Sequence, residues 1–412
     1  MTPLGILAAG GGIPIEIAET AAANGRPVHL VGLVDEADPA IARFPHTWIA
    51  WGQIGRMLAA LRAAGCRDVV IVGRTRRPAL RSIKPDFGLL AALPTLVRSL
   101  TGGDDRVLRQ VIRFFEDRGF RICGVPEVAP TLLAGAGVLA RHRPSAQHES
   151  EAARGLALIA ALAPWDIGQA VAVCDGQVLA IEAAEGTDGM LRRLADRSGT
   201  GGVFVKAPKP GQELRIDLPA IGPDTVVGAR RAGLAGLALA AGRVVVAARR
   251  DVLVAADAAG LFLVGLNVPA SAQPVPTGEA GAAAIDRTAL GRIVPRSRDR
   301  IDIAKGIGVL RTVARFGTSA GVVVARAHVL GIETGEGLDR LVRRIRDLKQ
   351  WGDRETRRRR GVLIVRAASD VTDGVIAGAA AADLAGLAVA NAGAEVSLGA
   401  LGDRHGLFVV AG

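Results

Sequence analysis

The feature that most constrains the fold of this chain is an internal repeat. Residues 302–345 align with residues 151–194 without a gap, at an offset of 151 positions and with 14 identities in 44 positions. The similarity resumes downstream, where LAGLAV at 384–389 matches LAGLAL at 234–239 and GLFVV at 406–410 matches GLFLV at 260–264. A repeat of this kind is a structural unit that the chain uses twice. We therefore predict that the C-terminal part of the chain is a second copy of its middle domain.

The two copies differ in their polar segments. Gly236 follows Lys206 by 30 residues in the first copy, whereas the matching Gly386 follows Arg366 by 20 residues. The ten missing residues fall in the stretch that reads PKPGQELRIDLP in the first copy. The second copy also has Gly317, Ser319 and Ala320 where the first has Asp166, Gly168 and Gln169. We expect the second copy to keep the apolar frame of the first without its polar loop, and to be non-catalytic.

The sequence before the repeat alternates strand and helix patterns. Strands are expected at 4–9, 26–36 and 68–73, with helices between them, and this alternation predicts a parallel sheet with helices on its faces. The predicted fold class is α/β, with a Rossmann-like N-terminal domain, a second α/β domain and a degenerate repeat of that second domain at the C-terminus. The expected boundaries are 1–140 for the Rossmann-like domain, 148–266 for the catalytic domain, 267–297 for a Pro-containing linker and 298–412 for the degenerate copy.

Composition narrows the range of partners. Half of the residues are hydrophobic and 22% are charged, which is typical of a folded protein. Aromatic residues make up only 3% and Tyr is absent, so we expect no nucleic-acid partner bound by base stacking. The three Cys residues form no CxxC pair, the N-terminus lacks the pattern of a signal peptide, and no run of about 20 apolar residues is free of charge. These observations favour a cytoplasmic protein.

The net charge of +11 suggests an anionic partner, but the excess is local. Residues 338–360 hold ten Lys and Arg against four Asp and Glu, and the run belongs to the second copy and not to the catalytic unit. It is either a solvated helix and loop, or a surface for transient contact with the anionic inner face of the membrane. The charge therefore says little about an active site.

Glycines follow the first predicted strand and precede the first predicted helix. Gly10, Gly11 and Gly12 would let backbone N–H groups and a helix N-terminus approach a phosphate, and a plain tight turn is the alternative. A dinucleotide fingerprint needs a third glycine where Ile15 stands, so NAD binding is disfavoured. GRTRRP, at 73–78, follows another predicted strand, and its Arg groups and Thr75 would face the crevice where open α/β sheets bind ligands, or lie in a solvated basic turn.

Two groups of acidic residues are further candidates for binding. Asp104 and Asp105 follow paired glycines, so they are expected either to hold Mg²⁺ beside a phosphate or to cap the next helix. Glu185, Thr187 and Asp188 would converge at the mouth of a strand, again with helix capping as the alternative. Because Glu185 and Asp188 recur in the copy that lost its polar loop, a structural role for them is slightly favoured.

The stretch VKAPKPGQELRIDLPAIGPDT, at 205–225, carries the most polar chemistry. Its candidate residues are Lys206, Lys209, Gln212, Arg215 and Asp217, in a loop stiffened by three prolines. Lys and Arg neutralise phosphate oxygens, and a carboxylate activates water or binds Mg²⁺. The loop therefore suits phosphoryl chemistry, with a solvated surface loop as the alternative.

Six motifs occur in order over roughly residues 1–266. They are GILAAGGGIPIEIAE, GQIGRML, GDD at 103–105, DIGQAVAV, IEAAEGTDGML and the loop just described. Together they resemble the LpxI family, the UDP-2,3-diacylglucosamine pyrophosphatases of lipid A synthesis. The resemblance implies Mg²⁺-dependent hydrolysis of UDP-2,3-diacylglucosamine to UMP and 2,3-diacylglucosamine 1-phosphate. It also implies a two-domain protein that buries a lipid-linked UDP-sugar between its domains and dimerises.

The resemblance assigns roles to individual residues. The family's essential aspartate lies in an R-x-D-L-P-x-[IV]-G segment, which places it at Asp217 and makes Asp224 a lower-ranked rival. Asp217 is expected to be the general base or, with Asp188, a Mg²⁺ ligand, and Lys206 and Arg215 are expected to be catalytic cations. The expected substrate contacts are Gly10, Gly11, Gly12, Thr75, Asp104, Asp105, Gln169, Glu185, Gly186, Thr187, Lys209 and Gln212. AAGGGIP stands where the family reads AGGGxLP, a small departure at the glycines.

The C-terminal copy has no part in that catalytic loop. We expect it to take the place of a partner subunit's domain within one chain, which would give a pseudo-dimer. The alternative to an enzyme is a non-catalytic regulator that binds a nucleotide sugar, and the intact DLP segment at Asp217 argues against it.

Overall fold

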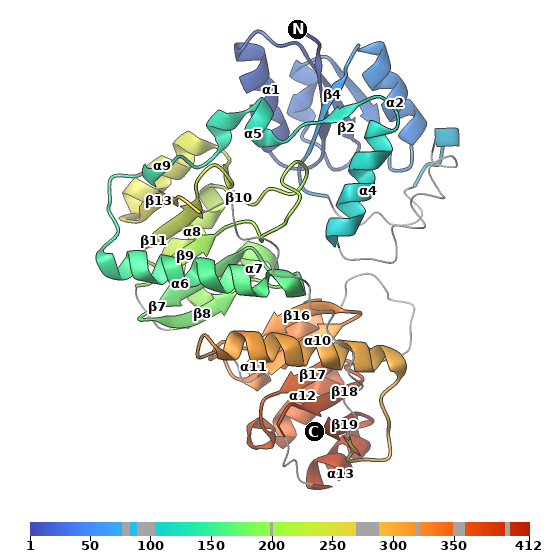
Figure 1. The fold of residues 1–412 in the computed structure, drawn as a ribbon, viewed down its shortest axis with the longest axis vertical. Helices are drawn as coiled ribbons and strands as arrows, with labels where there is room; N and C mark the ends of the chain where they lie inside the picture. The colour runs from blue at the N-terminus through green and yellow to red at the C-terminus, as the bar shows by residue number, and fades with distance from the viewer. Residues whose placement is uncertain are drawn as a thin grey trace.

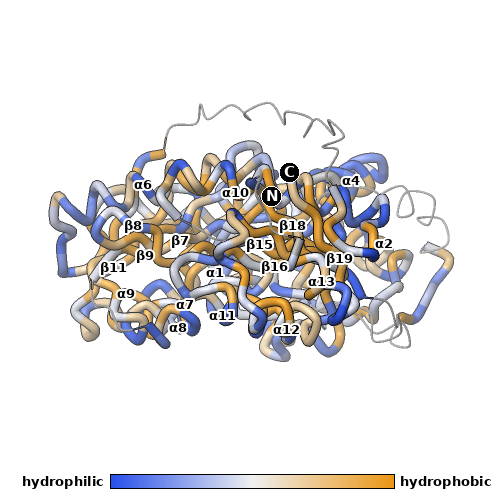
Figure 2. The backbone as a smooth tube through the Cα atoms, turned by 90° about the horizontal axis from the view of Figure 1, so that it is seen from below, coloured by the Kyte–Doolittle hydropathy of each residue, from blue (hydrophilic) through white to orange (hydrophobic). Residues whose placement is uncertain are grey.

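The computed structural model describes residues 1–75, 83–88, 104–197, 201–268, 288–318, 321–348, 359–391 and 396–412. These residues form three α/β units in chain order, each built on its own sheet (Figure 1). Hydrophobic stretches follow the strands in the interior, and the most hydrophilic stretches lie on outer turns and helices (Figure 2). Within the described ranges, every helix is too short or too polar to traverse a lipid bilayer. The chain is therefore an α/β protein whose second unit is repeated, as predicted.

The first unit is a parallel sheet with a Rossmann-like strand order. Its strands are β1 (Leu4–Ala8), β2 (Val28–Leu33), β3 (His46–Ile49), β4 (Asp68–Val72) and β5 (Arg121–Ile122), in the order β3-β2-β1-β4-β5. Its helices are α1 (Ile13–Ala23), α2 (Ile54–Ala63), α4 (Asp104–Glu116) and the short α5 (Val125–Val128). The strand order reverses between β1 and β4. Open α/β sheets bind ligands beyond the carboxyl ends of the strands at such a point, where Gly10 and Thr75 lie.

The second unit is a mixed sheet flanked by helices. Its strands are β6 (Gly137–Val138), β7 (Ala170–Cys174), β8 (Gln177–Ile181), β9 (Val203–Lys206), β11 (Gly236–Ala240) and β13 (Phe262–Leu266), in the order β6-β13-β11-β9-β7-β8. Its helices are α6 (Ala146–Leu162), α7 (Gly186–Ala195), α8 (Pro223–Arg231) and α9 (Arg249–Ala259), and β10 (Ala220–Ile221) pairs with β12 (Val245–Val246) beside the sheet. Strands β9, β11 and β13 are parallel, whereas β7 and β8 form an antiparallel hairpin at the edge.

The third unit repeats this topology strand for strand. Its strands are β14 (Thr288–Ala289), β15 (Gly321–Ala325), β16 (His328–Ile332), β17 (Val362–Val365), β18 (Gly386–Val389) and β19 (Phe408–Ala411), in the order β14-β19-β18-β17-β15-β16. Its helices are α10 (Ser297–Ala314), α11 (Leu338–Leu348), α12 (Asp373–Ala381) and α13 (Val396–His405). Gly236 pairs with Phe262 in one sheet and Gly386 with Phe408 in the other, and each phenylalanine ring fills the space that a glycine Cβ would need. The repeat therefore extends to the packing of single side chains.

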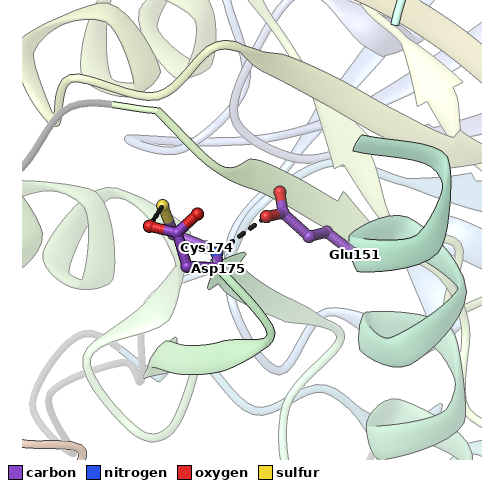
Figure 3. Close-up of side chains that lie close together, drawn as sticks. All are labelled: Glu151, Cys174 and Asp175. Carbon is purple, nitrogen blue, oxygen red and sulfur yellow. Dashed lines mark hydrogen bonds between the residues drawn. The ribbon is translucent and has the colours of Figure 1, made fainter. Parts of the chain in front are cut away.

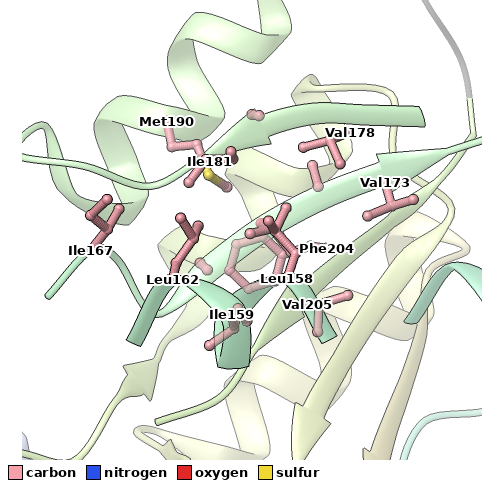
Figure 4. Packing of buried hydrophobic residues seen from close by; sticks show 14 of the residues in the cluster. Leu158, Ile159, Leu162, Ile167, Val173, Val178, Ile181, Met190, Phe204 and Val205 are labelled. Atoms are coloured by element: carbon pink, nitrogen blue, oxygen red, sulfur yellow. The ribbon is translucent and has the colours of Figure 1, made fainter. Parts of the chain in front are cut away.

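The core of the second unit lies between α6 and its sheet. Leu158 and Leu162 of α6 pack near Phe204 of β9, Ile181 of β8 and Met190 of α7, all essentially excluded from solvent (Figure 4). Burying one large apolar side chain contributes about 1.5–3 kcal/mol before the entropy cost of ordering it. The same apolar pattern holds α7 against β8, and α7 carries several candidate site residues at its start.

The two copies pack against each other through α6 and α10. One apolar cluster contains buried residues of both copies. The indole Nε1 of Trp165 donates to Thr312 Oγ1 at 2.9 Å, and a Cβ on Gly308 would collide with the indole ring, so α10 approaches Trp165 closely only because residue 308 is glycine. Arg154 Nη2 donates to the carbonyl oxygen of Phe316 at 2.9 Å. The two copies therefore form one packed pair within this chain.

Two short edge strands cross the expected domain boundaries. Strand β6 (Gly137–Val138) pairs with β13 in the second sheet, although the first domain was expected to reach residue 140. Strand β14 (Thr288–Ala289) pairs with β19 in the third sheet, although it falls in the expected linker 267–297. Two-residue edge strands carry no alternating apolar pattern, so the sequence gives no sign of them. Residues 269–287 of that linker lie outside the described residues.

Candidate active site

The candidate site begins where the carboxyl ends of β1 and β4 meet. Gly10 and Arg74 pair there, and each backbone N–H donates to the other's carbonyl oxygen at 2.8 Å. A Cβ on Gly10 would stand 3.0 Å from the Arg74 carbonyl oxygen, and Gly11 has a φ of +96°, so both positions suit glycine. Gly12 caps the N-terminus of α1, and Thr75 follows Arg74 on the exposed side. The predicted glycines thus lie together at a helix N-terminus, which favours a phosphate group.

The second unit meets this crevice at the start of α7. Asp188 lies in the first turn of α7, and its carboxylate stands 3.9 Å from the guanidinium group of Arg74. Both side chains are more than half exposed, so the pair adds little stability. It does show that the end of β4 and the start of α7 face each other across the two units.

Lys206 is a buried cation at the carboxyl end of β9. Its Nζ donates to Thr187 Oγ1 at 2.5 Å, and that hydroxyl donates to Glu182 Oε1 at 2.8 Å. Glu182 Oε2 lies 3.8 Å from the ammonium group. Burial lowers the pKa of Lys206 from its ordinary value, while the charges of Glu182, Asp188 and Asp217 oppose that shift. The cation is thus held by the Thr187 hydroxyl and the Glu182 carboxylate, and it is shielded from solvent.

Asp217 lies in the loop that only the first copy carries. Gln212 Nε2 donates both to Asp217 Oδ2 at 2.7 Å and to the Asp217 carbonyl oxygen at 2.8 Å. The amide of Gln212 is itself fixed, because its oxygen accepts from the backbone N–H of Lys209 at 2.9 Å. Gln212 is buried and Asp217 is half-buried. The loop therefore holds the carboxylate of Asp217 in one orientation.

Gln169 connects Asp217 with the Lys206 network. Its backbone N–H donates to Glu182 Oε2 at 3.0 Å, and its side-chain Nε2 makes a long contact of 3.5 Å with Asp217 Oδ2. The second copy has Ala320 at this position and lacks the loop that carries Asp217. The two groups that interact in the first copy are therefore both missing from the second.

The other two loop cations, Arg215 and Lys209, lie in ion pairs. The guanidinium of Arg215 pairs with Glu213 through two contacts of 2.9 Å, and with Glu116 of α4 at 3.2 Å. Arg215 lowers the pKa of the Glu213 carboxyl, and it ties the loop to the first unit. Lys209 Nζ pairs with the carboxylate of Asp166. The structure therefore brings Lys206 and Asp217 to one site, and places Arg215 and Lys209 where they anchor the loop.

Glu185 and Gly186 lie at the start of α7, beside the site. Gly186 has a φ of +70°, which turns the chain into the helix. The carboxylate of Glu185 faces Arg193 at 2.7 Å and Arg344 of the second copy. Among the other predicted residues, Asp104 begins α4 and Asp105 follows it, but their side chains lie outside the described residues.

Two family models cover this fold. Residues 3–132 match the LpxI N-terminal domain, and residues 135–264 and 286–373 match the LpxI C-terminal domain. The UDP-2,3-diacylglucosamine pyrophosphatase LpxI of Caulobacter vibrioides is 41% identical over 275 residues, which are 65% of this chain and 98% of that protein. This chain belongs to the LpxI family. The family's C-terminal domain occurs twice in this chain, and only the first copy has the loop with Asp217.

The structure adds Glu182 to the candidate site, and it places Asp188 near Arg74, one of the Arg groups expected to face the crevice. Glu182 accepts hydrogen bonds from both Thr187 and Gln169. It follows strand β8 directly, so its position after a strand was the available signal. Arg74 stands beside the predicted Thr75, but its approach to Asp188 depends on how the two LpxI domains face each other, which no local pattern reveals.

A second cluster of polar residues lies away from the LpxI loop. Glu151, Cys174 and Asp175 bring three ligand-type atoms within 4.8 Å of one another (Figure 3). However, Glu151 Oε1 accepts from the Asp175 backbone N–H at 2.7 Å, and burial raises the pKa of the Cys174 thiol to about 11, so the thiol stays protonated. In the second copy, Asp302 accepts from the backbone N–H of Arg326, the equivalent position, at 3.1 Å, and also from that of Ala327 at 2.6 Å. This cluster therefore caps a hairpin turn.

Proposed function

We propose that this chain hydrolyses the pyrophosphate bond of UDP-2,3-diacylglucosamine, giving UMP and 2,3-diacylglucosamine 1-phosphate in lipid A synthesis. The Caulobacter relative is named as a UDP-2,3-diacylglucosamine pyrophosphatase, and this chain matches 98% of its length. The observation that carries the proposal is the fixed carboxylate of Asp217 in the same site as the buried cation of Lys206. A carboxylate that can accept a proton and a cation that can neutralise phosphate oxygens are groups that assist hydrolysis of a phosphate anhydride.

The proposed chemistry assigns a separate role to each side chain. The hydroxyl of a water molecule joins one phosphorus of the diphosphate, the bridging P–O bond breaks, and the departing phosphate leaves with the bond's electron pair. We assign to Asp217 the activation of that water, directly as general base or as a metal ligand. Lys206 neutralises charge on the diphosphate oxygens, and a buried cation does so more strongly than an exposed one.

The glycine crevice is assigned to the nucleotide half of the substrate. Gly10, Gly11 and Gly12 leave the N-terminus of α1 open to a phosphate group. Asp188 and Arg74 lie between this crevice and Lys206. The substrate would therefore extend from the first unit to the loop of the second, with its diphosphate near the centre.

Mg²⁺ is the proposed cofactor. The charges of Asp217 and Asp188 both act on that of Lys206, and carboxylate oxygens are ligands that Mg²⁺ prefers. Because Mg²⁺ usually takes one or two protein carboxylates and completes its shell with substrate phosphates and water, we assign these two residues to hold it. When bound, it would supply neutralisation of the phosphate charge that develops during hydrolysis.

Replacement of Asp217 tests the proposal directly. We expect Asp217→Asn to lower kcat for UMP release by about 10²–10⁴-fold, because Asn keeps the shape and the contact with Gln212 but loses the basic carboxylate. Asp224→Asn is the matched control, because Asp224 is exposed in the first turn of α8 and belongs to the same segment. The assay follows UMP with and without Mg²⁺, and circular dichroism verifies folding.

Three outcomes would contradict the proposal in different ways. Activity of Asp217→Asn within a few-fold of wild type would remove Asp217 from the reaction. A large loss in Asp224→Asn alone would move the role to Asp224. Binding of the substrate by the wild-type chain without any UMP release would instead support a non-catalytic nucleotide-sugar-binding regulator.

A further inference from the structure

Two buried ion pairs meet at the interface between the two copies. Arg193 bonds Glu185 at 2.7 Å in the first copy, and at the equivalent positions of the second copy Arg344 bonds Glu336 at 2.9 Å. The pairs also cross, because the guanidinium of Arg344 contacts Glu185 and that of Arg193 lies 3.8 Å from Glu336. All four side chains are at most 16% exposed. Each carboxylate is therefore near two arginines, one from each copy.

The same arginines also donate hydrogen bonds to backbone carbonyl oxygens at the ends of the edge strands β8 and β16. Arg193 Nη2 donates to the carbonyl oxygen of Ile181 at 3.2 Å, and Arg344 Nη2 donates to that of Ile332 at 2.9 Å. The four buried charges stabilise one another. Removing one arginine would leave a buried carboxylate whose negative charge is no longer fully neutralised, which is strongly destabilising. The cluster therefore fixes the positions of its members more strictly than an exposed salt bridge would.

Glu185 carries this constraint into the candidate active site. It directly precedes Gly186 and Thr187, and its side chain lies over Gly189, where a Cβ would stand 2.8 Å from the Glu185 Cβ. Thr187 Oγ1 receives the hydrogen bond from Lys206 Nζ at 2.5 Å. A shift of the Glu185 carboxylate would therefore move the hydroxyl that holds the buried cation.

The far end of α7 is tied to the second copy as well. Arg197 Nη1 donates to the carbonyl oxygen of Thr334 in the second copy at 2.7 Å, and to that of Leu179 in strand β8 at 2.9 Å. Thr334 is almost fully buried. Helix α7 thus contacts the second copy at both ends, through Glu185 at its start and Arg197 just after its last turn.

We propose that Arg344 of the non-catalytic copy is a positioning residue for the active site of the first copy. It holds the Glu185 carboxylate, which fixes the start of α7 and the Thr187 hydroxyl that supports Lys206. The second copy is then an intramolecular brace of the catalytic domain. This inference rests on the proposed hydrolysis, because one of its tests measures kcat. Its second test measures the local order of α7 and needs no enzymatic activity.

The test compares Arg344→Gln with Arg343→Gln in the full-length chain. Arg343 is an exposed neighbour on α11 whose Nε bonds the Asp339 carbonyl oxygen within the same helix, so its replacement should leave the site unchanged. We expect Arg344→Gln to lower kcat about tenfold with a smaller change in KM. Amide hydrogen exchange at 186–190 should quicken by a similar factor, while exchange in α1 stays as in wild type. Arg344→Lys should recover part of kcat, because it restores the charge without the second donor.

Removing both partners distinguishes positioning from general damage. In the Glu185→Gln background, Arg344→Gln should lower kcat less than it does in wild type, because the Glu185 carboxylate that Arg344 holds is already absent. The proposal is overturned if Arg344→Gln has wild-type kcat and wild-type exchange at 186–190. If the variant does not fold, Arg344→Lys supplies the same two readouts. If the wild-type chain releases no UMP, the proposed function fails, and exchange at 186–190 still decides whether Arg344 positions α7.

Discussion

Burial and nearby carboxylates act in opposite directions on Lys206. Burial lowers the pKa of its ammonium group, and Glu182, Asp188 and Asp217 raise it, with burial the stronger effect. The protonated form is the one that neutralises phosphate oxygens. A lysine at the surface would keep its proton up to about pH 10.4. We therefore expect the charge of Lys206 to limit the proposed activity on the alkaline side.

Activity and stability should depend on pH with opposite signs. The value of kcat/KM should fall as the pH rises through the lowered pKa of Lys206, which places the alkaline limb below a lysine's ordinary value. Stability should change oppositely in that window, because the unfolded chain binds the proton that the folded chain has lost, and unfolding then becomes harder as pH rises. Loss of activity without loss of stability therefore separates titration from unfolding.

Lys206→Arg is the informative variant for that profile. Arginine keeps its charge at any accessible pH, so the alkaline limb should move upward or disappear, even if the rate at neutral pH is lower. An alkaline limb at the same pH in wild type and Lys206→Arg would assign the titration to another group. A urea titration at each pH measures the stability of both proteins.

Single residues differ in how far the sequence predicts their roles. The residue types of the loop suggested phosphoryl chemistry and the family resemblance singled out Asp217, and the roles of Asp217 and Lys206 stay predictions. The partners of Arg215 and Lys209 were not predictable, because Glu116 and Asp166 are distant in sequence and meet the loop only in the folded chain. A cation in a polar loop has the same local pattern whether it binds substrate or an acidic side chain.

At the scale of elements, strands and helices followed their sequence patterns wherever those patterns were long. The alternation over residues 4–73 predicted the parallel sheet, and the offset of 151 predicted the third unit. The two-residue strands β6 and β14 were missed, because they are defined by pairing with distant strands. The approach of α10 to Trp165 was also invisible, since it depends on one glycine meeting one ring across the repeat.

The close contact between α10 and Trp165 predicts how a substitution at Gly308 changes stability. Alanine in a helix is more favourable than glycine by about 1 kcal/mol, so Gly308→Ala would ordinarily stabilise α10. Here the new Cβ would collide with the Trp165 ring, and overpacking of this kind costs about 1–3 kcal/mol. We expect Gly308→Ala to lower the free energy of unfolding in wild type and to raise it in a Trp165→Ala background. Urea unfolding of the four proteins measures both, and stabilisation in both backgrounds would contradict the close packing.

At the scale of the whole molecule, the third unit covers the face of the second. An apolar cluster runs through both copies, and α7 is tied across the interface at each end. If the family's dimers pair through this face of the second unit, as we expect, the copy already occupies that surface. The chain should therefore be monomeric, with a light-scattering mass of 42.4 kDa. A mass of twice that value would show that another surface pairs two chains.

The covalent link between the copies has a consequence for how their interface behaves. Linking two binding partners turns their association into an intramolecular event, with an effective concentration in the millimolar range for a short flexible connection. Dilution should therefore not separate the copies, and specific activity should stay constant at concentrations where dimers of separate chains dissociate. In a symmetric dimer every substitution appears on both faces at once. Here Trp165 of the first copy contacts Gly308 of the second. The equivalent of Trp165 in the second copy is Phe316, and the equivalent of Gly308 in the first copy is Ala157. The two sides of this near-symmetric interface can therefore mutate independently of each other.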